Sequence, residues 1–238
     1  MRWVHDVFGN SVAIASFDLP ATELRIESCL ELETYVVDQP ASQIAPNAAS
    51  YPFIYSADDR IDLGRMLERH YPDPHNRLAA WAEGFIRSNP TDTLALLADL
   101  NAGVATSISY QSREAEGTQT PLETLARGWG SCRDFAMLLI EAARSLGFGA
   151  RAVTGYLYNP ASADHVPAPG TTHAWADIYV PGAGWVSYDP TNPAIGGGNL
   201  IRVAVTRDIS QAVAVSGSFV GAPDDYLGMN VSVSVARE

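Results

Sequence analysis

The stretch that decides the fold runs from Gly128 to Gly147 and reads GWGSCRDFAMLLIEAARSLG. Its second half has apolar residues at the i, i+3, i+4 and i+7 spacing of a helix with one buried face. These residues are Phe135, Leu138, Leu139, Ala142 and Leu146. Ser131 and Asp134 have the spacing of a capping box at its start, and Gly147 fits the left-handed residue that ends many helices. The sequence therefore predicts a buried helix that begins at Cys132.

Cys132 takes the first helical position in this prediction. The free N–H groups and the positive end of the helix dipole favour a thiolate there. Gly128 and Gly130 remove side chains just before it, so we expect a substrate backbone to come close. A small cysteine that only fills the core is the alternative interpretation.

Composition limits the function classes. At 238 residues, 47% hydrophobic and 18% charged, the chain is typical of a soluble globular protein with one large or two small domains. A net charge of −12 argues against nucleic acid as a partner, because nucleic-acid binding needs basic patches. No apolar run approaches the roughly 18 residues that span a bilayer, so we expect no membrane partner. The start of the chain lacks the features of a secretory signal, and the expected location is cytoplasmic.

Lysine and cysteine usage narrow the chemistry further. All fifteen basic residues are arginine, which excludes a lysine Schiff base and a phosphate-loop lysine and leaves no lysine to accept an acyl group. Cys29 and Cys132 are the only cysteines, so there is no disulfide framework and no Cys-x-x-Cys motif. Cys29 falls among charged residues of a predicted strand, and we interpret it as structural or incidental.

Three segments follow from the patterns along the chain. Residues 1–38 are predicted to form a partial β-domain, with a turn at 6–10 and a strand near 22–33 in which apolar and charged residues alternate. Residues 39–60 contain several prolines and read as a linker. Residues 61–238 are predicted to be the catalytic domain.

Helices come first in that domain and strands second. Helices are predicted at 61–69, at 76–88, from Thr91 or Asp92 onward, and from Pro121. The predicted strands are 150–158, 173–180, 185–189, 200–206, about 213–220 and about 229–236. His70 and His75 flank two prolines without a third ligand nearby, so we interpret them as loop histidines and not as a metal pair.

A second chemical signal lies in the hairpin predicted over 173–189. Pairing across a turn near Pro181 or Gly182 matches residues whose numbers sum to about 362–364, which makes His173 and Asp189 cross-strand neighbours. A carboxylate beside an imidazole fixes the ring tautomer and stabilises its charged form, as a general base requires. With Cys132 these residues make a candidate Cys-His-Asp catalytic set. A metal site made from the same three residues is the alternative, although a helix N-terminus suits a nucleophile better than a ligand.

Four motifs together resemble the bacterial transglutaminase-like superfamily. They are GSCRDFA at 130–136, ARSLGFGARAVTGY at 143–156, HAWAD at 173–177 and GWVSYDPTN at 184–192. The resemblance covers roughly residues 105–220, and DVFGNSV at 6–12 resembles the end of that family's N-terminal β-domain. It implies an α+β fold with a papain-like core, in which the catalytic Cys, His and Asp fall on Cys132, His173 and Asp189. It also implies an oxyanion donor from an upstream aromatic, with Tyr110 as first candidate and Trp129 as second.

The function implied is acyl chemistry on protein or peptide amides through a thioester intermediate. Water as the acceptor would make the enzyme an amidase or cysteine protease, and an amine would make it a transglutaminase; the sequence leaves both open. Two alternative functions are not enzymatic: a non-catalytic binding scaffold of the same fold, and a metal-binding module. We expect no cofactor, no metal and no EF-hand calcium site. An exposed edge of the partial N-terminal sheet would favour a weak homodimer.

Overall fold

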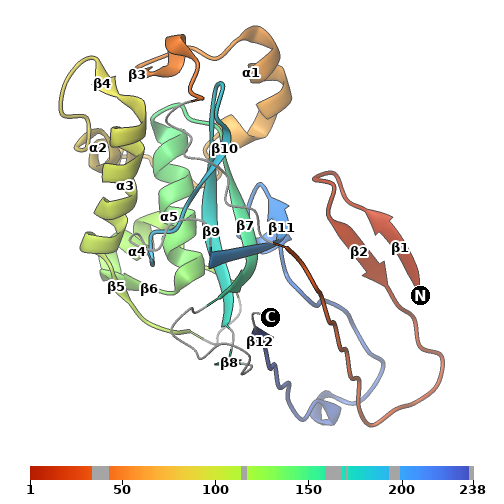
Figure 1. The fold of residues 1–238 in the computed structure, drawn as a ribbon. Helices are drawn as coiled ribbons and strands as arrows, with labels where there is room; N and C mark the ends of the chain where they lie inside the picture. Colours follow the sequence, from red (N-terminus) through yellow and green to blue (C-terminus); the bar gives the residue numbers. More distant parts are fainter. Residues whose placement is uncertain (34–42, 114–116, 159–167, 170, 193–198, 236–238) are drawn as a thin grey trace. The chain divides into compact units, whose positions relative to one another are not determined.

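The computed structural model describes residues 1–33, 43–113, 117–158, 168–169, 171–192 and 199–235 (Figure 1). The chain divides into two compact units, Met1–Asp38 and Gln39–Glu238. Within the described residues, no helix is long and apolar enough to cross a membrane.

The first unit holds an antiparallel hairpin of β1 (Arg2–His5) and β2 (Ser11–Ile14). The turn predicted between them is confirmed, because the Asp6 carboxylate accepts the backbone N–H groups of Phe8 at 2.9 Å and Asn10 at 2.8 Å. The strand predicted near 22–33 is wrong. These residues pair with no described strand, and the apolar side chains of the alternating pattern are 50–64% exposed: Leu24, Ile26, Leu30 and Leu32.

The second unit begins with short elements and helices. They are the 3-10 helix η2 (Pro46–Ala48), β3 (Ser50–Tyr51), α1 (Ala57–Leu63), the 3-10 helix η3 (Gly64–Leu67), α2 (Arg77–Glu83), β4 (Thr91–Asp92), α3 (Thr93–Ser107), β5 (Ser109–Tyr110), α4 (Pro121–Arg127), β6 (Trp129–Gly130) and α5 (Cys132–Ser145). Side-chain caps set several starts: Ser56 accepts the Asp59 N–H at 3.0 Å, which begins α1 before the predicted residue 61. Asp92 accepts the Ala95 N–H at 2.8 Å and begins α3 where predicted.

A four-stranded antiparallel sheet follows, in the order β10-β9-β7-β11. Its strands are β7 (Ala150–Leu157), β9 (Thr171–Val180), β10 (Gly184–Tyr188) and β11 (Leu200–Thr206). The 3-10 helices η5 (Ile209–Gln211) and η6 (Pro223–Asp225) come next, and β12 (Ser234–Val235) pairs with β8 (Ala168–Pro169). The strand predicted at 213–220 is wrong, since this stretch joins no described sheet and Val213, Val215 and Phe219 are mostly exposed. Of the one predicted at 229–236, only Ser234–Val235 forms a strand.

Helix α5 is the centre of the core, with β7 and β9 on one side and α2, α3 and α4 on the other (Figure 1). Its apolar residues are buried as predicted, with Leu138, Leu139 and Ala142 inaccessible to solvent. The sheet residues in the same core cluster include small side chains that recur every second position: Ala150 and Ala152 on β7, Ala174 and Ala176 on β9. Small side chains on this face leave room for α5 to pack against β7 and β9.

The predicted linker, 39–60, lies in the second unit, and its described part packs against the core. Tyr55 is 5% exposed; its hydroxyl donates to the Tyr179 carbonyl at 2.7 Å and accepts the Gly149 N–H at 3.1 Å. The Thr93 hydroxyl donates to the carbonyl of buried Ala48 at 2.6 Å. The prolines predict an irregular backbone here, but the aromatic side chains between them bury apolar area against the core and hold this stretch in place.

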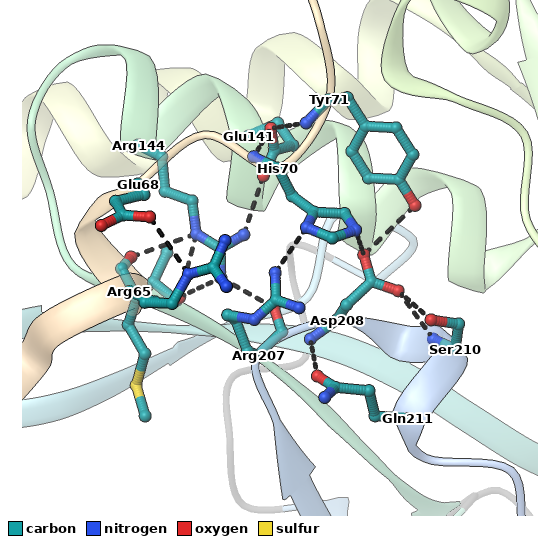
Figure 2. Close-up of polar contacts among 12 residues, drawn as sticks. Arg65, Glu68, His70, Tyr71, Glu141, Arg144, Arg207, Asp208, Ser210 and Gln211 are labelled. Atoms are coloured by element: carbon teal, nitrogen blue, oxygen red, sulfur yellow. Dashed lines mark hydrogen bonds and ion pairs between the residues drawn. The ribbon is translucent and has the colours of Figure 1, made fainter.

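A buried ion pair on α5 joins distant segments to the far end of the same helix (Figure 2). Arg144 and Glu141 are 2.8 Å apart and inaccessible to solvent. Glu141 also accepts the backbone N–H groups of His70 and Tyr71, and the Arg144 guanidinium donates to the carbonyls of three further segments: Met66, Ala150 and Arg207. Because both charges have several partners, the pair holds the chain after α1 and the chain after β11 against α5.

Candidate active site

The start of α5 is held by a buried carboxylate. Asp134 is inaccessible to solvent and accepts hydrogen bonds from four groups. They are the Ser131 N–H and hydroxyl at 2.8 Å each, the Gln119 N–H at 2.7 Å, and the Arg113 guanidinium, whose nearest contact is 3.0 Å. The bond from the Ser131 N–H is the half of the predicted capping box in which Asp134 reaches back to the N-cap. Cys132 is therefore the first residue of a helix whose N-terminal turn is fixed from several directions.

The other end of α5 also follows the sequence. Gly147 has a φ of +89°, and the Phe148 N–H reaches back to the Ala143 carbonyl at 3.0 Å. The Gly147 N–H meets the Arg144 carbonyl at the same distance, which completes a Schellman motif. The helix register that carries Cys132 is thus fixed at both ends.

Gly130 has a different role from the one that the sequence suggested. A Cβ on this residue would lie 2.8 Å from the Asp134 Cβ, so the missing side chain leaves room for the capping carboxylate. Gly128 ends α4 in the left-handed conformation, with a φ of +68°. One glycine thus serves the cap and the other serves the turn, and the expected approach of a substrate backbone stays a prediction.

His173 lies on β9 and is 7% exposed. Its Nε2 is 2.7 Å from Asp189 Oδ2, and the ring also makes a hydrogen bond to the Cys132 side chain. Because Nε2 faces the carboxylate, Nδ1 is the nitrogen available to the thiol. Burial disfavours the charged ring and is the largest influence, yet the hydrogen bonds and charges of Asp189 and Cys132 outweigh it and raise the pKa of His173 to about 9. Trp175 stacks on the ring with centroids 6.1 Å apart.

Asp189 follows β10 and is 8% exposed. The β9–β10 ladder pairs residues whose numbers sum to 364, such as Tyr188 with Ala176, so direct pairing of His173 with Asp189 is wrong by two residues. The side chains still meet because the chain leaves the ladder after Tyr188. Burial raises the pKa of the Asp189 carboxyl, but the His173 hydrogen bond and charge, with Thr191 and Asn192, bring it below its usual range.

Sequence reasoning missed the residues that surround this carboxylate. Asp189 Oδ1 accepts the Thr191 hydroxyl at 2.6 Å and the Thr191 N–H at 2.9 Å, and Oδ2 accepts the Asn192 side-chain amide at 3.1 Å. The signal was available in the motif GWVSYDPTN, since Thr and Asn two and three positions after an Asp favour local turns of this kind.

The two candidate oxyanion donors lie on adjacent short strands. Tyr110 on β5 pairs with Gly130 on β6, and the charge of Cys132, together with burial as the larger cause, raises the pKa of the Tyr110 hydroxyl. Its ring packs edge-on to Phe135, while 57% of the residue stays exposed. Trp129 instead lies under the Arg127 guanidinium, 5.8 Å from the ring centroid. The structure thus brings Tyr110 near the cysteine.

Other residues singled out in the sequence lie elsewhere. Cys29 is exposed in the first unit. The Nε2 of His70 is 3.8 Å from buried Asp208, at the edge of the ion-pair network of Figure 2, so this histidine is more than a solvated loop residue. In the part of the chain that the structure describes, no group of three or more His, Cys, Asp or Glu residues is arranged to hold a metal ion.

One segment of the chain and its fold are similar to known proteins. Residues 79–190 match the model of the transglutaminase-like superfamily, and this range contains Cys132, His173 and Asp189. A solved candidate cysteine protease from Cytophaga hutchinsonii shares the fold with a TM-score of 0.52 at 23% identity, over 70% of this chain and 53% of its own. The match thus spans about half of that chain.

Two further relatives have lower similarity or no assigned activity. The uncharacterized protein ML0607 of Mycobacterium leprae is 25% identical over 217 residues, which are 91% of this chain and 75% of that protein. The periplasmic domain of TgpA from Pseudomonas aeruginosa matches with a TM-score of 0.43 and 24% identity, over 57% of this chain and 48% of that one.

A cysteine at the start of a buried helix, facing a histidine on an antiparallel sheet, defines a papain-like α+β core. Residues 79–190 match the transglutaminase-like superfamily, and the fold agrees with that of the solved neighbour.

Proposed function

We propose that this chain is a cysteine-dependent enzyme that transfers or hydrolyses acyl groups of protein or peptide amides. The observation that carries the proposal is the line of contacts from the Cys132 side chain to His173 and from His173 Nε2 to Asp189 at 2.7 Å. All three groups are within the part of the chain that matches the superfamily model.

In the first half of the reaction, His173 Nδ1 takes the Cys132 proton. The thiolate then attacks the amide carbon, and the carbonyl oxygen becomes an oxyanion. The donors that would hold this oxyanion are the Tyr110 hydroxyl and the Cys132 N–H, which at the first position of α5 has no partner carbonyl within the helix. The hydrogen bond and the charge of Asp189 outweigh the burial of the ring and favour the imidazolium that this step creates.

In the second half, the imidazolium gives its proton to the leaving amine, and the C–N bond breaks. The product is a thioester between the acyl group and Cys132. Asp189 keeps the proton on Nε2 throughout, so that Nδ1 alone exchanges a proton with the reacting groups. Water or an amine then attacks the thioester and frees the thiolate.

The acceptor decides between an amidase or cysteine protease and a transglutaminase. The test is a glutamine-containing peptide incubated with the protein, with and without a small primary amine such as methylamine, and analysed by mass spectrometry. Because the chain has no lysine, it offers no lysine amine of its own to compete with the added one. Amine incorporation would assign acyl transfer, and deamidation or backbone cleavage alone would assign hydrolysis.

The matched control is Cys132→Ser, with Cys29→Ser as the parent in every sample. Loss of every product in Cys132→Ser and retention in the parent would support the proposal. If a panel of peptides gives no product, and the protein forms no covalent adduct with thioester-forming probes, the proposal is wrong.

A further inference from the structure

The chain after β10 surrounds the Asp189 carboxylate with donors. Besides His173, the donors are two backbone N–H groups, one hydroxyl and one amide, all from Thr191 and Asn192. The shortest of these bonds is 2.6 Å, from the Thr191 hydroxyl to Oδ1. A buried carboxylate with this number of neutral donors stays ionised and keeps one orientation.

The Thr191 oxygen sits at the centre of this arrangement. Its single proton goes to Asp189 Oδ1, so its lone pairs remain available as acceptors. One of them receives the Asn192 side-chain amide at 3.1 Å, and the same oxygen is 3.3 Å from His173 Nε2. The Nε2–H therefore faces two acceptors, Asp189 Oδ2 and Thr191 Oγ1.

The position of Thr191 follows from the turn after β10. The β9–β10 ladder ends at Tyr188, and the next residues fold around Asp189, whose Oδ1 accepts the Thr191 N–H at 2.9 Å and the Asn192 N–H at 3.3 Å. This turn brings the Thr191 hydroxyl to both the carboxylate and the His173 Nε2.

We propose that Thr191 is a positioning residue for the His173–Asp189 pair, with Asn192 in support. This inference rests on the proposed function, because it assigns the residue that orients the base of that reaction. The hydroxyl holds the carboxylate and gives the Nε2–H a second acceptor, so the neutral ring keeps its proton on Nε2 and leaves Nδ1 open to the thiol. In the described chain, the titratable groups that face the ring are Cys132 from α5 and Asp189 after β10.

The test compares Thr191→Val, which keeps the shape and loses the hydroxyl, with Thr191→Ser, which keeps the hydroxyl. The matched control is Thr106→Val on α3, whose hydroxyl bonds only to carbonyls of its own helix. All variants carry Cys29→Ser. The readouts are the rate of Cys132 alkylation by iodoacetamide near neutral pH and the NMR titration of the His173 ring.

We expect alkylation about tenfold slower in Thr191→Val, which is the size expected for one hydrogen bond to a charged group, with the ring titrating at lower pH. The alkylation rate of Thr191→Ser should stay within about twofold of the parent rate, and the rate of Thr106→Val should equal the parent rate. Asn192→Ala is the second variant and should shift both readouts in the same direction as Thr191→Val.

Two results would overturn the inference. In one, Thr191→Val and Asn192→Ala both match the parent in rate and titration. In the other, Thr191→Ser is as impaired as Thr191→Val, which would mean packing and not the hydroxyl. Failure of the proposed function is a separate result: the parent would form no acyl-enzyme, while the ring titration would still decide the role of Thr191.

Discussion

Replacing Asp189 by asparagine should change how the stability of the fold depends on pH. The His173 side chain is 6% exposed and depends on this carboxylate for its charged form. The difference between its pKa of about 9 and the ordinary value of about 6.5 corresponds to about 3 kcal/mol. Because the ring is buried, solvent screening reduces this energy little. The energy belongs to the interaction of His173 with Asp189 and not to one of the two residues.

The direction of this pH dependence follows from the raised pKa of His173. A histidine that is more basic in the folded protein than in the unfolded chain stabilises the fold fully below about pH 6.5, and this contribution disappears as the pH rises toward about 9. Asp189 has a lowered pKa, so its own contribution is lost only in acid, below the usual range of a carboxyl group. In Asp189→Asn the stabilisation from the charged His173 ring is gone, because no carboxylate opposes the effect of burial on that ring.

The assay is urea unfolding followed by tryptophan fluorescence, at several pH values between about 6 and about 10. We expect the native protein to exceed Asp189→Asn by up to about 3 kcal/mol near pH 6, and the gap to narrow steadily toward pH 10. NMR of the His173 ring checks the cause directly. A gap that is the same at every pH, together with a ring that titrates in its ordinary range in the native protein, would refute the reasoning.

Three other substitutions test separate parts of the structure. Gly130→Ala places a methyl group 2.8 Å from the Asp134 Cβ and should lower the free energy of unfolding by about 1–3 kcal/mol. The control Gly217→Ala, whose new methyl group meets nothing within 4 Å, should change this free energy little, and equal values for the two variants would contradict the packing argument. Glu141→Gln leaves a buried guanidinium without its counter-charge and should cost about 3–5 kcal/mol by urea unfolding, and a cost below about 1 kcal/mol would show that the charge is compensated elsewhere. Tyr110→Phe removes a candidate oxyanion donor and should slow acylation of the cysteine about a hundredfold with stability unchanged; an unchanged rate would exclude this role.

Local patterns were enough to predict the part of the fold that carries the nucleophile. The apolar spacing of α5, its Asp134 cap and the left-handed Gly147 all depend on residues within about one or two turns of each other, and all are present. The pairing of His173 with Asp189 required only the hairpin register, and the family resemblance added Cys132 to the pair. The register was two residues off, because the strand ends before Asp189 and the side chain covers the remaining distance.

Long-range contacts could not be predicted in this way. Glu141 lies among apolar residues of α5, and no local pattern indicates that it accepts N–H groups from a segment about seventy residues earlier (Figure 2). The strands predicted near 22–33 and at 213–220 have the right alternation but no partner among the described residues, and alternation without a partner makes no sheet. The substrate class and the cellular compartment stay predictions, and the sequence favours neither water nor an amine as the acceptor.

The central claim is that His173 activates Cys132, and its most direct test is the rate of Cys132 alkylation by iodoacetamide at several pH values from about 4 to about 9. The native chain and His173→Ala are compared, both with Cys29→Ser. We predict that native Cys132 reacts readily at weakly acidic pH, where an unassisted thiol is almost unreactive, and that His173→Ala removes this advantage. The same slow reaction in both proteins at acidic pH would contradict the account and favour a non-catalytic scaffold.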